Sequence, residues 1–265
     1  MLYDTAMHEL WKSSTNPFEG KTQFAPSPQG SLIFENYFLV DNQLNDSIPV
    51  YILPDLCAHL IIHEFNHTEK VSLNIIGPRS AGFLINRKNR KRTFIARFKP
   101  GVLFSILGTP ANAIKNLSVP LNAIIDFKPA HIYLQYFQNK KKSAGEIFKN
   151  IEQLILTYYF EQPNAHILFL LKKIKAKNDK INVNLISQEL GFSNRYLQKL
   201  CNKYIGLTPK EILRVERFTK TIKNHLAFKN YTWTDVAHLS GYTDQSHLIA
   251  DYQQLIGKTP HKLFS

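Results

Sequence analysis

The chain has 265 residues, of which 44% are hydrophobic, and this is enough for two domains with ordinary cores. Its formal net charge is +13, and residues 166–265 hold most of the excess, with 16 Lys and Arg against 7 Asp and Glu. The chain has two cysteines, which exclude a disulfide framework and a four-cysteine zinc site. We expect neither secretion nor membrane spanning, because the sequence shows no leader-like start and no run of about 18 apolar residues. We therefore expect a cytoplasmic protein whose basic half suits phosphate groups.

The first half of the chain is typical of a β-rich domain. Residues 1–30 show little pattern and predict an irregular entry, and the basic run Arg87–Arg92 predicts a solvated hairpin tip. Short apolar or alternating runs, separated by Pro, Gly and Asn, predict a small antiparallel sandwich or barrel. These runs are Leu32–Val40, Val50–Leu53, Ala58–Phe65, Val71–Ile76 and Thr93–Phe98.

One motif in this half raises an alternative function. The run His63-Glu64-Phe65-Asn66-His67 matches the zinc-peptidase pattern, which needs a helix so that both histidines share one face. The preceding residues favour a strand and the following residues a turn. Since alternate residues of a strand share a face, a metal site lined by Cys57, His59, His63 and His67 is a second possibility. We predict no catalytic residue, no metal and no cofactor, and retain a metal-dependent hydrolase as the alternative.

Two helices are expected to connect the halves. The first runs from Ala144 to about Phe160 with one apolar stripe, and Gln162-Pro163 ends it before a second helix from Asn164 to Ala176. The stripe fits equally a dimer contact and packing of the helix on its own domain, because a stripe does not identify its partner.

The stretch from Asn182 to Pro260 contains one pattern twice. A short helix leads to Gly191-Phe192-Ser193 in the first copy and to Gly241-Tyr242-Thr243 in the second, and each is followed by a longer helix. We expect the glycines to end the short helices, the aromatics to enter the core, and Ser193 and Thr243 to cap the next helices. Two helices joined by so short a turn indicate a helix-turn-helix.

A single helix is expected between the copies, from Pro209 to about Leu226. Thr208 and Glu211 form a capping box around Pro209. At about 1.5 Å per residue the helix is roughly 27 Å long, which suits two motifs on successive major grooves about 34 Å apart.

These residues resemble the DNA-binding domain of the AraC/XylS family of bacterial transcription regulators. The strongest match is Gly241–Leu248 with Gly257-Lys258-Thr259-Pro260, supported by Gly206-Leu207-Thr208-Pro209. In the N-terminal half, Leu53-Pro54-Asp55, Ile76-Gly77-Pro78 and Arg97–Gly101 are similar to landmarks of a cupin-like domain in one branch of the family, which usually has Gly in place of Leu56.

The resemblance implies an α+β chain with a β-rich sensor or dimerisation domain and an all-α domain with two helix-turn-helix motifs. The expected bounds are 1–140 for the β-rich domain, 141–162 for a helical connector and 163–265 for the DNA-binding domain, with motifs at about 183–205 and 234–256.

Nine residues at the starts of the two recognition helices are the candidate DNA contacts: Asn194, Arg195, Tyr196, Gln198, Lys199, Asp244, Gln245, Ser246 and His247. Arg grips guanine and Gln pairs with adenine in bidentate fashion, so Arg195, Gln198 and Lys199 lead the set. Gln245 and His247 have an alternative role in bracing their own turn. Where many family members carry a polar and then a basic residue, this chain has Ile249-Ala250 followed by Asp251, so we expect the first motif to dominate.

The expected partner is double-stranded promoter DNA, and no membrane is expected. RNA polymerase, a small-molecule effector of unknown identity and a second copy of the chain are further candidates. A dimerisation domain without any ligand is an alternative for the N-terminal half. A DNA-repair protein with a cysteine methyl acceptor needs a cysteine zinc cluster, which two cysteines do not supply.

Overall fold

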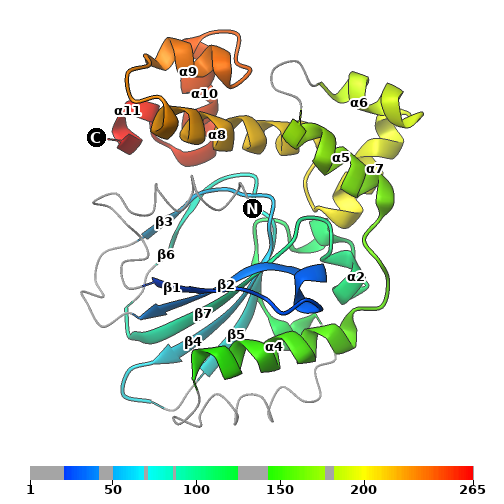
Figure 1. Cartoon of the computed structure of the whole chain (residues 1–265), viewed down its shortest axis with the longest axis vertical. Helices are drawn as coiled ribbons and strands as arrows, with labels where there is room; N and C mark the ends of the chain where they lie inside the picture. Colours follow the sequence, from blue (N-terminus) through cyan, green and yellow to red (C-terminus); the bar gives the residue numbers. More distant parts are fainter. Residues whose placement is uncertain are drawn as a thin grey trace.

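A computed structural model describes residues 21–41, 50–68, 71–85, 88–124, 143–176 and 182–264. It has a β-rich N-terminal part with a layer of helices across one end of it (Figure 1). Six antiparallel strands form one sheet in the order β1-β2-β7-β4-β5-β8, and β3 pairs with β6 in a second sheet. The strands are β1 Lys21–Phe24, β2 Phe34–Asp41, β3 Val50–Ile52, β4 His59–Phe65, β5 Val71–Ile76, β6 Phe83–Ile85, β7 Arg90–Phe98 and β8 Ser118–Pro120.

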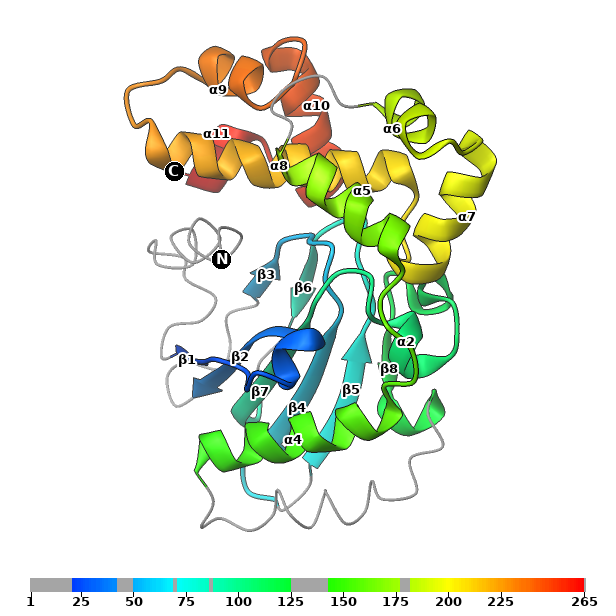
Figure 2. The ribbon, with the colours of Figure 1, turned by 45° about the vertical axis from the view of Figure 1, so that its right-hand side comes forward.

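Helix α4, Ala144–Tyr158, covers one face of the large sheet and runs across its strands (Figure 2). Alternate residues of the strands, such as Leu60 and Ile62, are buried on this face because successive side chains point to opposite sides. Phe148 stacks on Tyr37 with ring centroids 4.8 Å apart, and the Tyr37 hydroxyl donates to Glu152 Oε2 over 2.7 Å. The apolar stripe of α4 therefore packs on its own sheet, which is the second of the two uses expected for it.

Two expectations for this half were wrong. The irregular entry expected for residues 1–30 is wrong at residues 21–24, which form an edge strand against β2, because four residues of mixed polarity carry no pattern that predicts a strand. Residues 1–20 lie outside the described part of the chain. The basic run is no hairpin tip, since β6 pairs with β3 and β7 pairs with β2 and β4. Arg90–Arg92 lie within β7, and the turn before it contains Asn89 at φ 65°. Pairing partners of short strands are decided by the tertiary fold, not by local sequence.

The C-terminal part consists of helices around one buried cluster, which includes Leu197, Leu200, Ile212, Phe218 and Tyr252. These helices are α5 Ala165–Ala176, α6 Val183–Leu190, α7 Asn194–Tyr204, α8 Pro209–Ala227, α9 Trp233–Leu239, α10 Gln245–Ile256 and α11 Pro260–Phe264. Short helices in the N-terminal part are η1 Gly30–Leu32, α2 Phe104–Leu107, η2 Ala111–Ile114 and η3 Leu121–Ala123. The α+β fold class, with a β-rich part followed by an all-α part, is confirmed.

No helix within the described ranges has both the length and the apolar character needed to cross a bilayer.

Candidate nucleic-acid interface

The first helix-turn-helix is formed by α6 and α7. Asn182 caps α6 by accepting from the Leu185 backbone N–H over 2.9 Å, and Gly191 ends it in the left-handed conformation at φ 68°. Ser193 caps α7, accepting from the Tyr196 N–H over 3.2 Å. The predicted glycine turn and serine cap are both confirmed.

The second motif, formed by α9 and α10, differs at its turn. Gly241 is left-handed at φ 83° as predicted, but the cap of α10 is Asp244, whose carboxylate accepts from the His247 N–H over 2.8 Å. The prediction of Thr243 as the cap was wrong, because the second copy has one more residue than the first and that residue lies between the glycine and the cap. Thr243 instead meets His247 Nδ1 through its hydroxyl at 3.2 Å.

Helix α8 joins the two motifs. The predicted capping box is present, with Glu211 N–H donating to Thr208 Oγ1 and Thr208 N–H donating to Glu211 Oε2 over 2.9 Å, around Pro209 at the first helical position. Its 19 residues span about 28 Å at 1.5 Å per residue. This helix therefore connects the two motifs in the chain.

On α7, the candidate contacts divide into exposed and braced residues. Arg195, Gln198 and Lys199 are exposed, and their side chains hold no hydrogen bond or ion pair with another described residue, while Leu197 faces the core. Asn194 is used inside the motif, because its amide group bonds to the hydroxyl of Ser187 and the side-chain oxygen of Asn184. Tyr196 packs edge-on against Phe192 at 4.7 Å.

On α10, Gln245 and Ser246 are exposed at the first turn. Gln245 Oε1 accepts a hydrogen bond from Thr234 Oγ1 over 3.0 Å, which links α10 to α9. His247 packs edge-on against the Tyr242 ring at 5.1 Å, and Asp244 serves the cap. These contacts correspond to the bracing role expected as the alternative for Gln245 and His247.

Asp251 has a role in packing α10 that the sequence analysis did not predict. It is only 5% exposed and faces α8, where it accepts a hydrogen bond from Arg217 Nη2 over 3.2 Å and forms an ion pair with Arg214 Nε at 3.3 Å. The acidic residue therefore does not stand on the outer surface of α10. Its spacing was a usable signal, because it lies three residues after the buried Leu248, and the two arginines are three apart on one face of α8.

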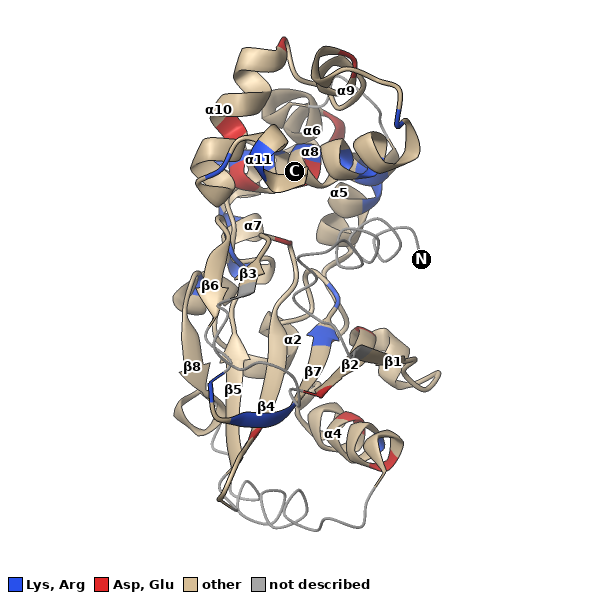
Figure 3. Ribbon diagram, turned by 90° about the vertical axis from the view of Figure 1, so that its left-hand side faces the viewer, with Lys and Arg blue, Asp and Glu red and all other residues tan. Residues whose placement is uncertain are grey.

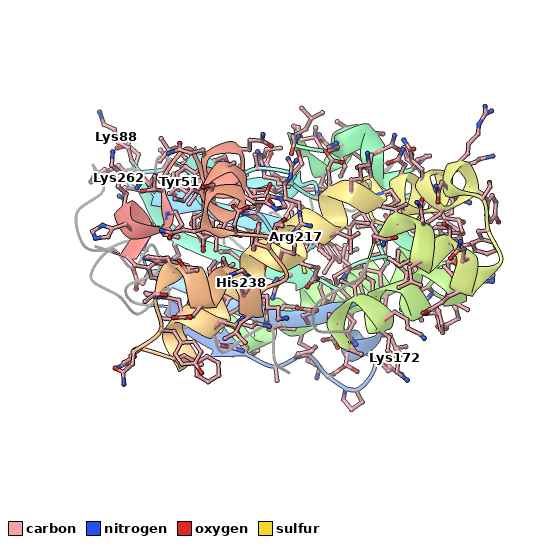
Figure 4. The ribbon with its side chains drawn as sticks, turned by 90° about the horizontal axis from the view of Figure 1, so that it is seen from above. Tyr51, Lys88, Lys172, Arg217, His238 and Lys262 are labelled. Atoms are coloured by element: carbon pink, nitrogen blue, oxygen red, sulfur yellow. The ribbon has the colours of Figure 1, made fainter. Side chains whose placement is uncertain are left out.

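Basic residues follow the C-terminal helices. In Figure 3, Lys and Arg mark α5, α8 and α11. Viewed onto these helices, Arg217 lies near the middle, with Lys172 toward one end and Lys262 toward the other (Figure 4). Lys and Arg residues on helices that carry two such motifs suit a phosphate backbone.

The zinc-peptidase pattern does not form a metal site of that type. His63 lies in strand β4, with Nδ1 3.0 Å from Thr93 Oγ1, and His67 lies in the following turn at φ 57°. Glu64 points to the opposite face and accepts from Arg92 Nε and Nη2 at 2.8 and 2.9 Å. The two histidines therefore share no helical face. No three His, Cys, Asp or Glu side chains in the described ranges are grouped to hold a metal ion.

Two capped helix-turn-helix motifs on one rigid helix define the C-terminal part as a DNA-binding module of duplicated type. The helix-turn-helix domain model of this class matches residues 186–265, and a domain of unknown function, DUF6597, matches residues 22–120. Residues 186–265 therefore form a helix-turn-helix domain of the AraC type, as the sequence resemblance predicted.

Curated relatives and solved structures are more distant. The invasion protein InvF of Salmonella typhi and of Salmonella typhimurium is 29% identical over 82 residues, which cover 31% of this chain and 37% of the relative. Apo ToxT from Vibrio cholerae is 12% identical with a TM-score of 0.46, over 86% of this chain and 97% of ToxT. The AraC-like transcriptional activator CuxR is 12% identical with a TM-score of 0.20, over 89% and 92% of the two chains. The two structural scores add no weight to the assignment.

Proposed function

We propose that the chain regulates transcription by reading two successive major grooves of promoter DNA, one with α7 and one with α10. The observation that carries this is the pair of recognition helices fixed to one 19-residue helix, each with an exposed first turn. Helix α8 is about 28 Å long, which is comparable to the repeat of about 34 Å between major grooves on one side of a duplex.

Within this proposal the nine candidate residues take different parts. Arg195, Gln198 and Lys199 read bases and phosphates from α7, because they are exposed and hold no other described partner. Gln245 and Ser246 approach the DNA from α10. The remaining residues, Asn194, Tyr196, Asp244 and His247, hold the two turns in shape and approach the phosphates there.

The N-terminal part acts as the control domain in this proposal. We place the domain boundary between α4 and α5, because α4 is buried on the sheet and α5 contributes to the C-terminal cluster. Control by an effector or by a second copy, and contact with RNA polymerase, follow from the family resemblance. In this proposal the protein acts in the cytoplasm, and it uses no cofactor and catalyses no reaction.

The test is selection of bound duplexes from a random pool with the full chain, repeated with Arg195→Ala and Gln245→Ala. A site of two parts, each part degraded by one of the variants, supports the proposal. As a control, Lys149→Ala changes an exposed lysine on α4, at the far side of the sheet, and leaves the selected site unchanged. Enrichment of no sequence, with binding that only follows salt concentration, would refute sequence reading by the free protein.

A further inference from the structure

The N-terminal domain touches the second recognition helix at its C-terminal end. The Gly82 N–H donates to the carbonyl oxygen of Leu255 over 2.6 Å. Leu255 lies in the last turn of α10, where backbone carbonyls have no partner within the helix. The segment before β6 therefore supplies a backbone donor to the end of α10.

The same segment touches the chain just after the first recognition helix. Gly206 is left-handed at φ 86°, and a Cβ placed on it would come within 2.5 Å of Pro78 Cγ and 2.9 Å of the Ala111 carbonyl oxygen. The backbone after α7 is thus seated directly on the N-terminal domain. Next to it, the Tyr204 ring packs edge-on against Phe104 of α2 at 5.2 Å.

Pro78 and Gly82 are four residues apart, so their Cα atoms are separated by at most about 14 Å. The segment Pro78–Gly82 is itself braced against the turn before β8. Asn116 N–H donates to the Pro78 carbonyl oxygen and Ser80 N–H to Asn116 Oδ1, both over 3.0 Å. One short and braced piece of chain therefore holds the C-terminal ends of both recognition helices.

Further contacts join the N-terminal domain to α8 and to the end of α10. Lys115 Nζ bonds to Glu211 Oε1 and Oε2 at 2.7 and 2.9 Å, and Glu211 belongs to the capping box at the start of α8. Figure 4 shows Tyr51 of β3 beside the C-terminal helices, and Lys258, just after α10, has its Nζ 5.9 Å from the ring centroid. Leu56 is buried in the same cluster as the C-terminal helices.

These contacts leave the DNA-facing turns uncovered, since Arg195, Gln198 and Gln245 are exposed. The domain contact therefore does not block DNA. We infer that the Pro78–Gly82 segment fixes the separation of α7 and α10 and so determines which spacing of the two half-sites the protein accepts. This inference rests on the proposed function, in which both helices read DNA. One added base pair moves a half-site by about 3.4 Å along the duplex and turns it about the axis, so a rigid holder discriminates against it.

The test uses the full chain on duplexes that carry the two selected half-sites at the selected spacing and at one or two base pairs more or less. The wild type should lose about tenfold or more in affinity for each wrong spacing. Two variants weaken the contacts of the Pro78–Gly82 segment with the C-terminal helices. One inserts a glycine between Ser80 and Ala81, and the other combines Pro78→Ala with Lys115→Ala. Both should bind all spacings within about threefold of one another.

The matched control inserts a glycine between Asn66 and His67, in the turn between β4 and β5 at the end of the sheet away from the C-terminal helices (Figure 2). It should keep the wild-type spacing preference. Circular dichroism and binding to the first half-site alone verify that each variant is folded. Folded variants that keep the wild-type spacing preference would overturn the inference. A wild type that selects no two-part site would instead refute the proposed function.

Discussion

Replacing Asp251 by alanine removes the buried carboxylate that joins α10 to α8. Asp251 holds Arg214 and Arg217 at 3.3 and 3.2 Å, and those arginine side chains are 39% and 32% exposed. Hydrogen bonds to charged groups contribute about 1.5–3 kcal/mol, whereas exposed ion pairs contribute about 0–1 kcal/mol. Because only the acid is buried, the expected loss of unfolding free energy lies in the lower part of the first range, at about 2 kcal/mol.

The assay is urea denaturation of the wild type, Asp251→Ala, Arg217→Ala and the double variant. A coupling energy of about 1 kcal/mol between the two positions is expected, since they are in direct contact. Gln254→Ala, at an exposed position of the same helix, is the control and should cost less than about 0.5 kcal/mol. If Asp251→Ala costs no more than the control, or the two changes are simply additive, then the pair does not hold α10 in place.

Three further outcomes follow from burial in other parts of the chain. Burial raises the pKa of Cys201 to about 12 and the pKa of Cys57 well above its usual range, so alkylation followed by mass spectrometry should be at least about tenfold slower in the native protein than in urea. Burial, with Arg90 nearby, lowers the pKa of His63 to about 3. As the pH falls, His63 of the unfolded chain is therefore protonated before His63 of the folded chain. The stability that comes from keeping His63 neutral is complete above about pH 6.5 and is lost as the pH falls toward 3. His63→Gln should flatten the dependence of the urea midpoint on pH over that window. Phe148→Ala should cost about 3–5 kcal/mol in denaturation, because it leaves a cavity beneath α4; a cost below 1 kcal/mol would contradict that packing.

Local signals predicted most of the helices and the long strands. The expected helix from Pro209 to about Leu226 is observed as Pro209–Ala227, and the expected strand Val71–Ile76 is observed with the same bounds. Caps and left-handed glycines act over three or four residues, so they can be recognised from the sequence. Strands β1, β6 and β8 were missed because three or four residues carry too little periodicity to distinguish them from loops.

The candidate site shows the same division. The exposure of Arg195, Gln198 and Lys199 followed from the helical spacing of Leu197, Leu200 and Cys201, which are buried. The ion pairs of Asp251 could not be predicted from the sequence, because the partners Arg214 and Arg217 lie on another helix more than thirty residues earlier. The local use of Asn194 and Gln245 within their motifs also depends on contacts between helices.

The amino-acid sequence by itself determined the duplicated helix-turn-helix, the single helix between the two copies and the outward faces of the recognition helices. Each of these depends on a repeat, a cap or a helical period that is contained in a short stretch of chain. Only the tertiary structure decided that α4 covers its own sheet and that Pro78 and Gly82 reach the ends of both recognition helices. Those contacts join residues that are far apart in the chain, by more than a hundred positions for Pro78 and Gly82. Their formation depends on how the apolar surfaces of separate elements fit together, which no local pattern encodes.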